Sequence, residues 1–171
     1  YHTVSSKKTL FVQAPTGVGK TMSAIFPSVR AIGEGKGETL FYLTAKTITG
    51  TVAWEAFHTL RENGLKFKVT AITAKEKLCF LDSPECTPEK CPYAKGHFDR
   101  VNDAVYELWT TEEVYSREVI RAHAEKWQVC PFEMCLDLSV WVDGVICDYN
   151  YAFDPNVHLK RFFGENISGD Y

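Results

Sequence analysis

The chain has 171 residues, 45% of them apolar, a net charge of −3 and an isoelectric point near 6. This size allows the core of one ordinary domain, and the charge gives no general attraction to nucleic acid, so such binding needs a local basic path. The sequence contains no membrane-spanning run and no secretory signal. Six cysteines without such a signal favour a metal or cluster over disulfides, in a reducing cytoplasm. Because the chain begins with Tyr1, we expect it to be part of a longer protein.

The first predicted elements surround a glycine-rich segment. Residues 9–12 are apolar and β-prone, and residues 22–32 have the mixed apolar spacing of a helix. Between them, residues 14–21 read Ala-Pro-Thr-Gly-Val-Gly-Lys-Thr. A strand, a glycine-rich turn and Gly-Lys-Thr at a helix start are typical of a phosphate-binding loop, because glycine backbones can point N–H groups at phosphate and a helix N-terminus favours anions.

This loop predicts a nucleoside triphosphate with Mg²⁺ as its ligand. Lys20 can reach the β- and γ-phosphates and the Thr21 hydroxyl can ligate Mg²⁺, so these two are the predicted catalytic residues. The alternative is a helix-start loop that merely contains glycines. The predicted nucleotide-binding residues are Thr16, Gly17, Val18, Gly19, Lys20 and Thr21.

The next segments follow an α/β pattern. Residues 39–44 form a nearly continuous apolar run, as in a strand covered on both faces. Residues 47–63 predict a helix, and the alternating residues 67–72 predict another strand. Strands and helices in alternation, joined by short loops, predict a parallel sheet with right-handed crossovers.

After residue 73 the strand pattern stops, and it returns only at residues 144–149. Between these points we expect helices, one of them with a buried stripe formed by Phe98, Val101, Val105 and Leu108. A candidate capping box formed by Thr110 and Glu113 would open the next helix, and residues 131–140 predict a further one. The predicted organisation is an α/β domain over residues 1–74, an insertion over residues 75–131 and a return to the α/β domain over residues 132–171.

The predicted insertion holds four of the six cysteines, Cys79, Cys86, Cys91 and Cys130. Four thiolates suit a tetrahedral zinc ion or an iron–sulfur cluster equally well by ligand count. The spacing lacks the paired C-x2-C arrangement of zinc ribbons, which disfavours zinc. His97 could replace one thiolate in a zinc site, although a packing histidine is the more common case.

The remaining cysteines are Cys135 and Cys147. Cys135 follows Cys130 by one and a half helical turns, so its side chain should point elsewhere. Cys147 lies in an apolar run and is predicted to be a buried structural thiol.

Four stretches, in the right order, resemble the superfamily 2 iron–sulfur DNA helicases of the XPD and DinG type. Residues 14–21 match the family's motif I, and residues 43–47, Leu-Thr-Ala-Lys-Thr, resemble its motif Ia. Residues 75–79 with the other three cysteines resemble its cluster-binding domain. Residues 148–155, Asp-Tyr-Asn-Tyr-Ala-Phe-Asp-Pro, are similar to its Asn-Tyr-x-Tyr-Leu-Leu-Asp-Pro segment. The short cysteine spacing fits a bacterial branch.

The resemblance implies a partial RecA-like P-loop NTPase domain with an inserted, mainly α-helical iron–sulfur domain. It implies a structural 4Fe–4S cluster on Cys79, Cys86, Cys91 and Cys130, and ATP with Mg²⁺ at the loop. The intact protein would be an ATP-dependent helicase, a monomeric motor that unwinds single-stranded or forked DNA in the 5′-to-3′ direction. The predicted DNA-binding residues, at motif Ia and around the first cluster ligand, are Thr44, Lys46, Thr47, Lys75 and Lys77.

One departure from the family concerns ATP hydrolysis. The family's Asp-Glu-Ala-His motif is expected after the Asp-Pro segment, but the chain ends at residues 168–171, Ser-Gly-Asp-Tyr. We therefore expect this fragment to lack useful ATP hydrolysis. Two alternatives stay open: a zinc-binding nucleic-acid-binding module with a vestigial phosphate loop, and a non-helicase P-loop NTPase with a zinc insertion.

Overall fold

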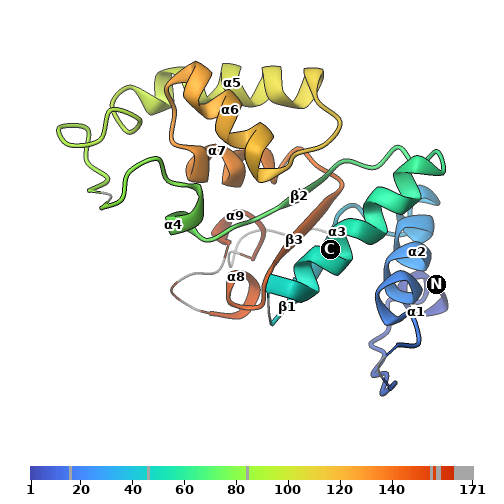
Figure 1. The fold of residues 1–171 in the computed structure, drawn as a ribbon. Coiled ribbons are helices and arrows are strands. Elements are labelled where there is room, and N and C mark those ends of the chain that lie inside the picture. Colours follow the sequence, from blue (N-terminus) through green and yellow to red (C-terminus); the bar gives the residue numbers. More distant parts are fainter. Residues whose placement is uncertain (16, 46, 84, 155, 157–158, 164–171) are drawn as a thin grey trace. The chain divides into compact units, whose positions relative to one another are not determined.

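The computed structural model describes residues 1–15, 17–45, 47–83, 85–154, 156 and 159–163, apart from the side chains of residues 47–49 and 161. The chain forms two compact units. We call residues 1–67 with 143–171 the sheet unit, and residues 68–142, which interrupt it in sequence, the cysteine unit (Figure 1). In the described part of the chain, every helix is too short or too polar to cross a membrane.

The sheet unit is built on two parallel strands, β1 (Leu40–Thr44) and β3 (Gly144–Asp148), paired from Leu40 opposite Gly144 to Thr44 opposite Asp148. The first four residues of β3 are buried, as expected for a strand covered on both faces. Helix α2 (Lys20–Gly33) packs against α3 (Thr47–Glu62), and both contact β1. Shorter helices are α1 (His2–Ser5), α8 (Asn150–Phe153) and α9 (Lys160–Phe163).

Helix α3 lies close to the strands at Gly50. A Cβ atom at Gly50 would lie 3.8 Å from the Ile146 side chain and 4.0 Å from the Thr44 hydroxyl. Further along α3, the Phe57 ring stacks on Phe67 at 5.9 Å. These contacts bury the apolar side of α3 in the sheet unit.

The cysteine unit is mainly helical. It contains a short strand, β2 (Val69–Ala71), and the helices α4 (Lys75–Leu78), α5 (His97–Thr111), α6 (Arg117–Trp127) and α7 (Pro131–Leu138). Helices α5, α6 and α7 pack pairwise. Their shared core includes the fully buried side chains of Leu108, Ile120, Met134 and Leu138. The chain is thus an α/β protein with short parallel pairing and a mainly helical inserted unit.

Several predicted elements are confirmed. The predicted strands 39–44 and 144–149 correspond to β1 and β3, and the predicted helices 22–32, 47–63 and 131–140 correspond to α2, α3 and α7. The predicted strand 67–72 is present only as the three residues of β2.

The predicted strand at residues 9–12 is wrong. These residues have no regular secondary structure, and Leu10, Phe11 and Val12 are 64%, 92% and 71% exposed. A β-prone segment forms a strand only where a neighbour pairs with its backbone, and no strand in the described residues pairs with this segment.

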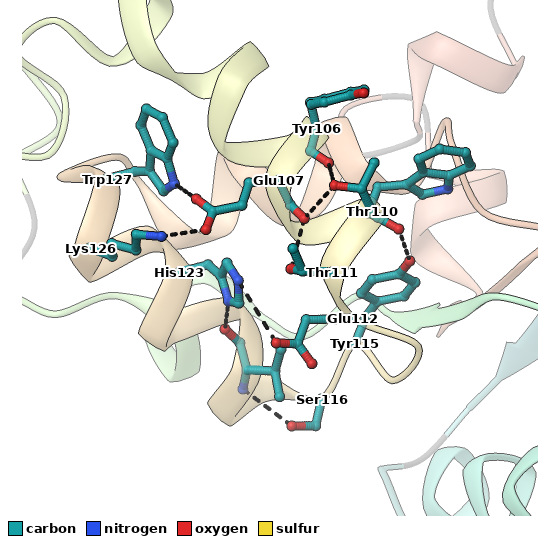
Figure 2. A network of polar contacts seen from close by, with 12 residues as sticks. Tyr106, Glu107, Thr110, Thr111, Glu112, Tyr115, Ser116, His123, Lys126 and Trp127 are labelled. Atoms are coloured by element: carbon teal, nitrogen blue, oxygen red, sulfur yellow. Dashed lines mark hydrogen bonds and ion pairs between the residues drawn. The ribbon is translucent and has the colours of Figure 1, made fainter.

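The predicted capping box is also wrong. Helix α5 continues to Thr111, and the Thr110 hydroxyl donates to the carbonyl oxygens of Tyr106 and Glu107 within that helix (Figure 2). Helix α6 is instead capped by Ser116, whose hydroxyl accepts the Val119 N–H at 3.3 Å. In the expected stripe of α5, Val101, Val105 and Leu108 are buried, but Phe98 in the first turn is 85% exposed.

Candidate functional site

The glycine-rich loop turns directly into α2. Gly17 and Gly19 have φ angles of +85° and +75°, in the left-handed region that favours glycine, and Gly19 is the N-cap of α2. A Cβ atom at either glycine would meet no atom within 4 Å, so the space beside both is open. The N–H groups of the first turn of α2 have no partner within the helix, and they are available to an anion in this space.

The two predicted catalytic residues occupy the first turn of α2. The Lys20 ammonium donates to the carbonyl oxygens of Pro15 at 2.6 Å and Ala14 at 3.2 Å, so the side chain folds back over the loop. The Thr21 hydroxyl accepts a hydrogen bond from the Tyr42 hydroxyl of β1 at 3.4 Å. Phosphate oxygens would give the Lys20 ammonium negatively charged acceptors in place of neutral carbonyl oxygens. The sequence analysis missed Tyr42, because its apolar run carries no signal for a polar role.

Two further loop residues, Val18 and Thr16, are predicted to bind the nucleotide. Val18 is exposed between the two glycines. Thr16 lies outside the described residues.

The predicted DNA-binding residues lie in different environments. Thr44 is only 6% exposed, and its carbonyl oxygen accepts the Tyr149 N–H at 3.1 Å. Lys46 and the Thr47 side chain lie outside the described part, as do residue 155 of the fourth resembling segment and the terminal residues 168–171. In the cysteine unit, Lys75 is half-buried and Lys77 is exposed, both on α4. These DNA contacts stay predictions.

The four predicted ligand cysteines all belong to the cysteine unit, at different depths. Cys91 is buried, Cys79 and Cys130 are half-buried, and Cys86 is exposed. Within the described ranges, no three Cys, His, Asp or Glu side chains are placed to hold one metal ion. A single zinc ion needs its ligands around one point, whereas each cysteine of a four-iron cluster binds a different iron atom. In the described residues, the four thiols therefore do not form a preformed single-ion site.

A lysine lies beside two of these cysteines. The Cys86 side chain raises the pKa of the Lys75 ammonium above its ordinary value, and Cys130 and Glu133 act in the same direction, while burial opposes them. The ammonium also lies 5.8 Å from the centre of the Phe132 ring. At Cys130, burial raises the pKa of the thiol, and Lys75 is one of the smaller causes that act to lower it.

Cys130 is the N-cap of α7. Burial raises the pKa of its thiol, and the backbone N–H groups of Glu133 and Phe132 in the first turn of α7 act in the opposite direction. The backbone N–H of Cys130 donates to Nδ1 of the buried His97 at 3.2 Å. His97 therefore contacts the backbone of a predicted ligand.

The other two cysteines are buried, as predicted for Cys147. Burial is the main cause that raises the pKa of Cys135 to about 11 and that of Cys147 to about 12. Such thiols are poor nucleophiles and poor metal ligands at neutral pH.

A polar network joins α5 to α6. The Glu107 carboxylate of α5 accepts hydrogen bonds from the Lys126 ammonium and the Trp127 indole N–H of α6, as Figure 2 shows. Lys126 and then Trp127 hold the pKa of this carboxyl below its ordinary value. The network fixes the end of α6, three residues before Cys130.

Comparison with known protein families gives no matching family model, and comparison with curated proteins gives no match. The function is therefore inferred from the chemistry of the two sites. One site is an open glycine turn at a helix start with a lysine folded over it, and the other is a set of four thiols with a lysine beside two of them.

Proposed function

We propose that this chain is part of an ATP-dependent DNA helicase of the superfamily 2 iron–sulfur class, the XPD and DinG type. The observation that carries the proposal is the turn at Gly17 and Gly19, which is open above both glycines and leads into Lys20 and Thr21 at the start of α2. A unit that holds the four predicted ligand cysteines interrupts the sheet unit of the same chain. The combination of these two features distinguishes this class from other P-loop NTPases.

At the loop, the backbone N–H groups of the glycine turn bind the phosphates of ATP. The Lys20 ammonium leaves the carbonyl oxygens of Ala14 and Pro15 and binds the β- and γ-phosphates, while the Thr21 hydroxyl, oriented by Tyr42, binds Mg²⁺. ATP hydrolysis and 5′-to-3′ unwinding belong to the intact enzyme, since this sequence contains no Asp-Glu-Ala-His motif.

In the cysteine unit, Cys79, Cys86, Cys91 and Cys130 hold a 4Fe–4S cluster. The cluster crosslinks segments that have no helix or strand of their own between α4 and α5 in the described residues. We assign single-stranded DNA as the ligand of two groups of residues, Lys46 and Thr47 at motif Ia in the sheet unit and Lys75 and Lys77 on α4 in the cysteine unit, each as backbone contacts. Thr44 is buried at the end of β1, so we assign it a role in supporting this segment and no direct contact with DNA.

Nucleotide binding by the 171-residue chain tests the first part of this proposal. Titration calorimetry with ATP and Mg²⁺ should show binding by the wild-type chain and a loss of about tenfold or more in K20A, because charge-assisted hydrogen bonds are lost. The matched control is K36A, an exposed lysine after α2 in the same unit. Equal affinities of K20A and K36A would overturn the assignment of the loop.

Metal analysis tests the second part. After anaerobic purification we expect a brown protein with about four iron and four sulfide ions per chain. The iron and sulfide should be lost in C91S and retained in C135S. One zinc and no iron in the same preparation would replace the helicase proposal with the zinc-bearing module.

A further inference from the structure

Two arginines of the cysteine unit bind backbone carbonyl oxygens on both sides of the predicted ligands. The first is Arg121 of α6. Its Nη1 donates to the carbonyl oxygens of Leu78 at 2.5 Å and Cys79 at 2.9 Å. Its guanidinium also lies 4.5 Å from the centre of the Phe80 ring. One side chain thus fixes the backbone at Cys79 and the ring that follows it.

The same contact extends to the segment of Cys91. The Phe80 ring packs against the Tyr93 ring with their centres 4.5 Å apart. Tyr93 is two residues from Cys91, which is buried. The stack of Arg121, Phe80 and Tyr93 therefore holds the first and third predicted ligand segments together.

The second arginine is Arg100, in the first turn of α5. Its Nε donates to the Trp127 carbonyl oxygen at 2.9 Å, and its Nη2 donates to the carbonyl oxygens of Gln128 at 2.6 Å and Lys95 at 2.8 Å. Lys95 follows Cys91 by four residues, and Gln128 precedes Cys130 by two. Arg100 therefore holds the third and fourth predicted ligand segments together.

The backbone around Arg100 is shaped for this role. Gly96 has a φ angle of +67°, and a Cβ atom there would lie 2.5 Å from Nη1 of Arg100. Gln128 also has a left-handed conformation, with a φ angle of +52°, which is unfavourable for a residue with a side chain. It lies two residues before Cys130, and Arg100 binds the Gln128 carbonyl oxygen. One turn of α5 also presents His97 to the Cys130 N–H.

These contacts matter because Cys79 and Cys91 lie in segments outside helices and strands, held otherwise by turns. Between α4 and α5, the described residues contain no helix or strand. A planar guanidinium presents several donors in a fixed geometry, so it can bind two or three carbonyl oxygens and stack on an aromatic ring at the same time.

We propose that Arg100 and Arg121 are positioning residues of the cysteine site, which hold Cys79, Cys91 and Cys130 ready for an iron–sulfur group. This inference rests on the proposed cluster. The arginines act through the backbone of the ligand segments. Their loss lets these segments separate and speeds the release of iron. Groups that orient metal ligands typically contribute about 10- to 100-fold to metal affinity.

The test compares R121Q and R100Q with R117Q in the whole chain. Arg117 is an exposed arginine of α6 whose guanidinium lies 3.4 Å from Glu118, so R117Q is a matched control. After anaerobic reconstitution with iron and sulfide, a chelator such as bathophenanthroline should remove iron from R121Q and R100Q about 10- to 100-fold faster than from the wild type or R117Q. The electron paramagnetic resonance spectrum of the reduced cluster should change in R121Q and not in R117Q, a result that a general loss of stability does not produce.

A conservative variant adds a further arm. R121K keeps the charge but lacks the planar guanidinium that stacks on Phe80 while it binds both carbonyl oxygens, so it should release iron about as fast as R121Q. If R121Q does not fold, F80L replaces it, since it removes the ring that joins Arg121 to Tyr93.

The outcomes separate this inference from the proposed function. A wild-type chain that binds iron and sulfide, with R121Q, R121K, R100Q and R117Q all releasing iron at its rate, overturns the positioning role and leaves the cluster in place. A wild-type chain that binds no iron and sulfide overturns the cluster and the positioning role together.

Discussion

The two units of this protein are stabilised in different ways. In the sheet unit, β1 and β3 share a continuous hydrogen-bond ladder, and the apolar sides of α2 and α3 are buried. In the cysteine unit, three helices form a core, but the cysteine-bearing segments are held by arginine side chains that bind carbonyl oxygens. The first kind of stabilisation is spread over many residues, and the second is concentrated in a few. Single substitutions should therefore act differently on the two units.

Thiol labelling gives the largest expected contrast between the units. In the sheet unit, burial and then Asp148 raise the pKa of Cys147 to about 12, whereas Cys86 in the cysteine unit is exposed. A thiol whose pKa lies about three pH units above that of an ordinary thiol has, at a fixed pH, a roughly thousandfold lower thiolate fraction. Iodoacetamide labelling of the iron-free chain, read by peptide mass spectrometry, should modify Cys86 first and Cys147 last. Equal labelling before urea is added would show that the sheet unit opens.

A cavity in the sheet unit should give the next largest effect. Ile146 of β3 is 3% exposed, so I146A removes buried methyl groups between β3 and α3. We expect the free energy of unfolding to fall by about 2–5 kcal/mol, measured by urea denaturation and circular dichroism. The control is V52A on the exposed side of α3, which should change it by less than about 1 kcal/mol. If I146A lowered the free energy of unfolding by less than about 1 kcal/mol, burial of the core would not be what stabilises the sheet unit.

A glycine substitution tests the concentrated contacts of the cysteine unit. G96A forces a side chain onto a φ angle of +67° and against the Arg100 guanidinium, so we expect a loss of about 1–3 kcal/mol. The matched control is G33A at the end of α2, where an added Cβ meets nothing within 4 Å and should be neutral or slightly stabilising. The measurement is the thermal unfolding midpoint, which should fall in G96A and not in G33A. Equal midpoints would remove the steric part of the argument for Arg100.

The smallest effect concerns pH and the network of Figure 2. Lys126 and then Trp127 lower the pKa of Glu107, so the folded state holds the charged form more strongly than the unfolded state. This contribution to stability is complete above the ordinary glutamate pKa and is lost as the pH falls through the lower, folded value. Between about pH 5 and pH 3, the wild-type urea midpoint should fall further than that of E107Q. The exposed Glu113 gives the control E113Q, which should follow the wild type.

The sheet unit could be predicted largely from its sequence. The continuous apolar run of β1 and the helical spacing of α3 each identify one element without reference to the rest of the chain. The failure at residues 9–12 has the opposite cause: whether a β-prone segment becomes a strand depends on a partner that local sequence does not specify.

The candidate sites show the same division. The turn of Gly17 and Gly19 into Lys20 was predicted because its pattern is contiguous. The roles of Arg100 and Arg121 could not be predicted, since their acceptors are carbonyl oxygens up to 43 residues away and any residue type supplies a carbonyl. One signal was present and not used: a glycine directly before a predicted helix, as at Gly96, indicates a left-handed residue or a close approach.

The exposed apolar residues before the loop have a consequence for handling the protein in solution. Leu10, Phe11 and Val12 expose most of their surface in a segment of high β-propensity. Such a segment is a template for strand pairing between copies, so the chain should aggregate as its concentration rises. A charged residue on this segment would act as a gatekeeper against aggregation. The same few residues that precede the glycine turn at Gly17 and Gly19 thereby set the upper concentration at which the purified chain can be studied.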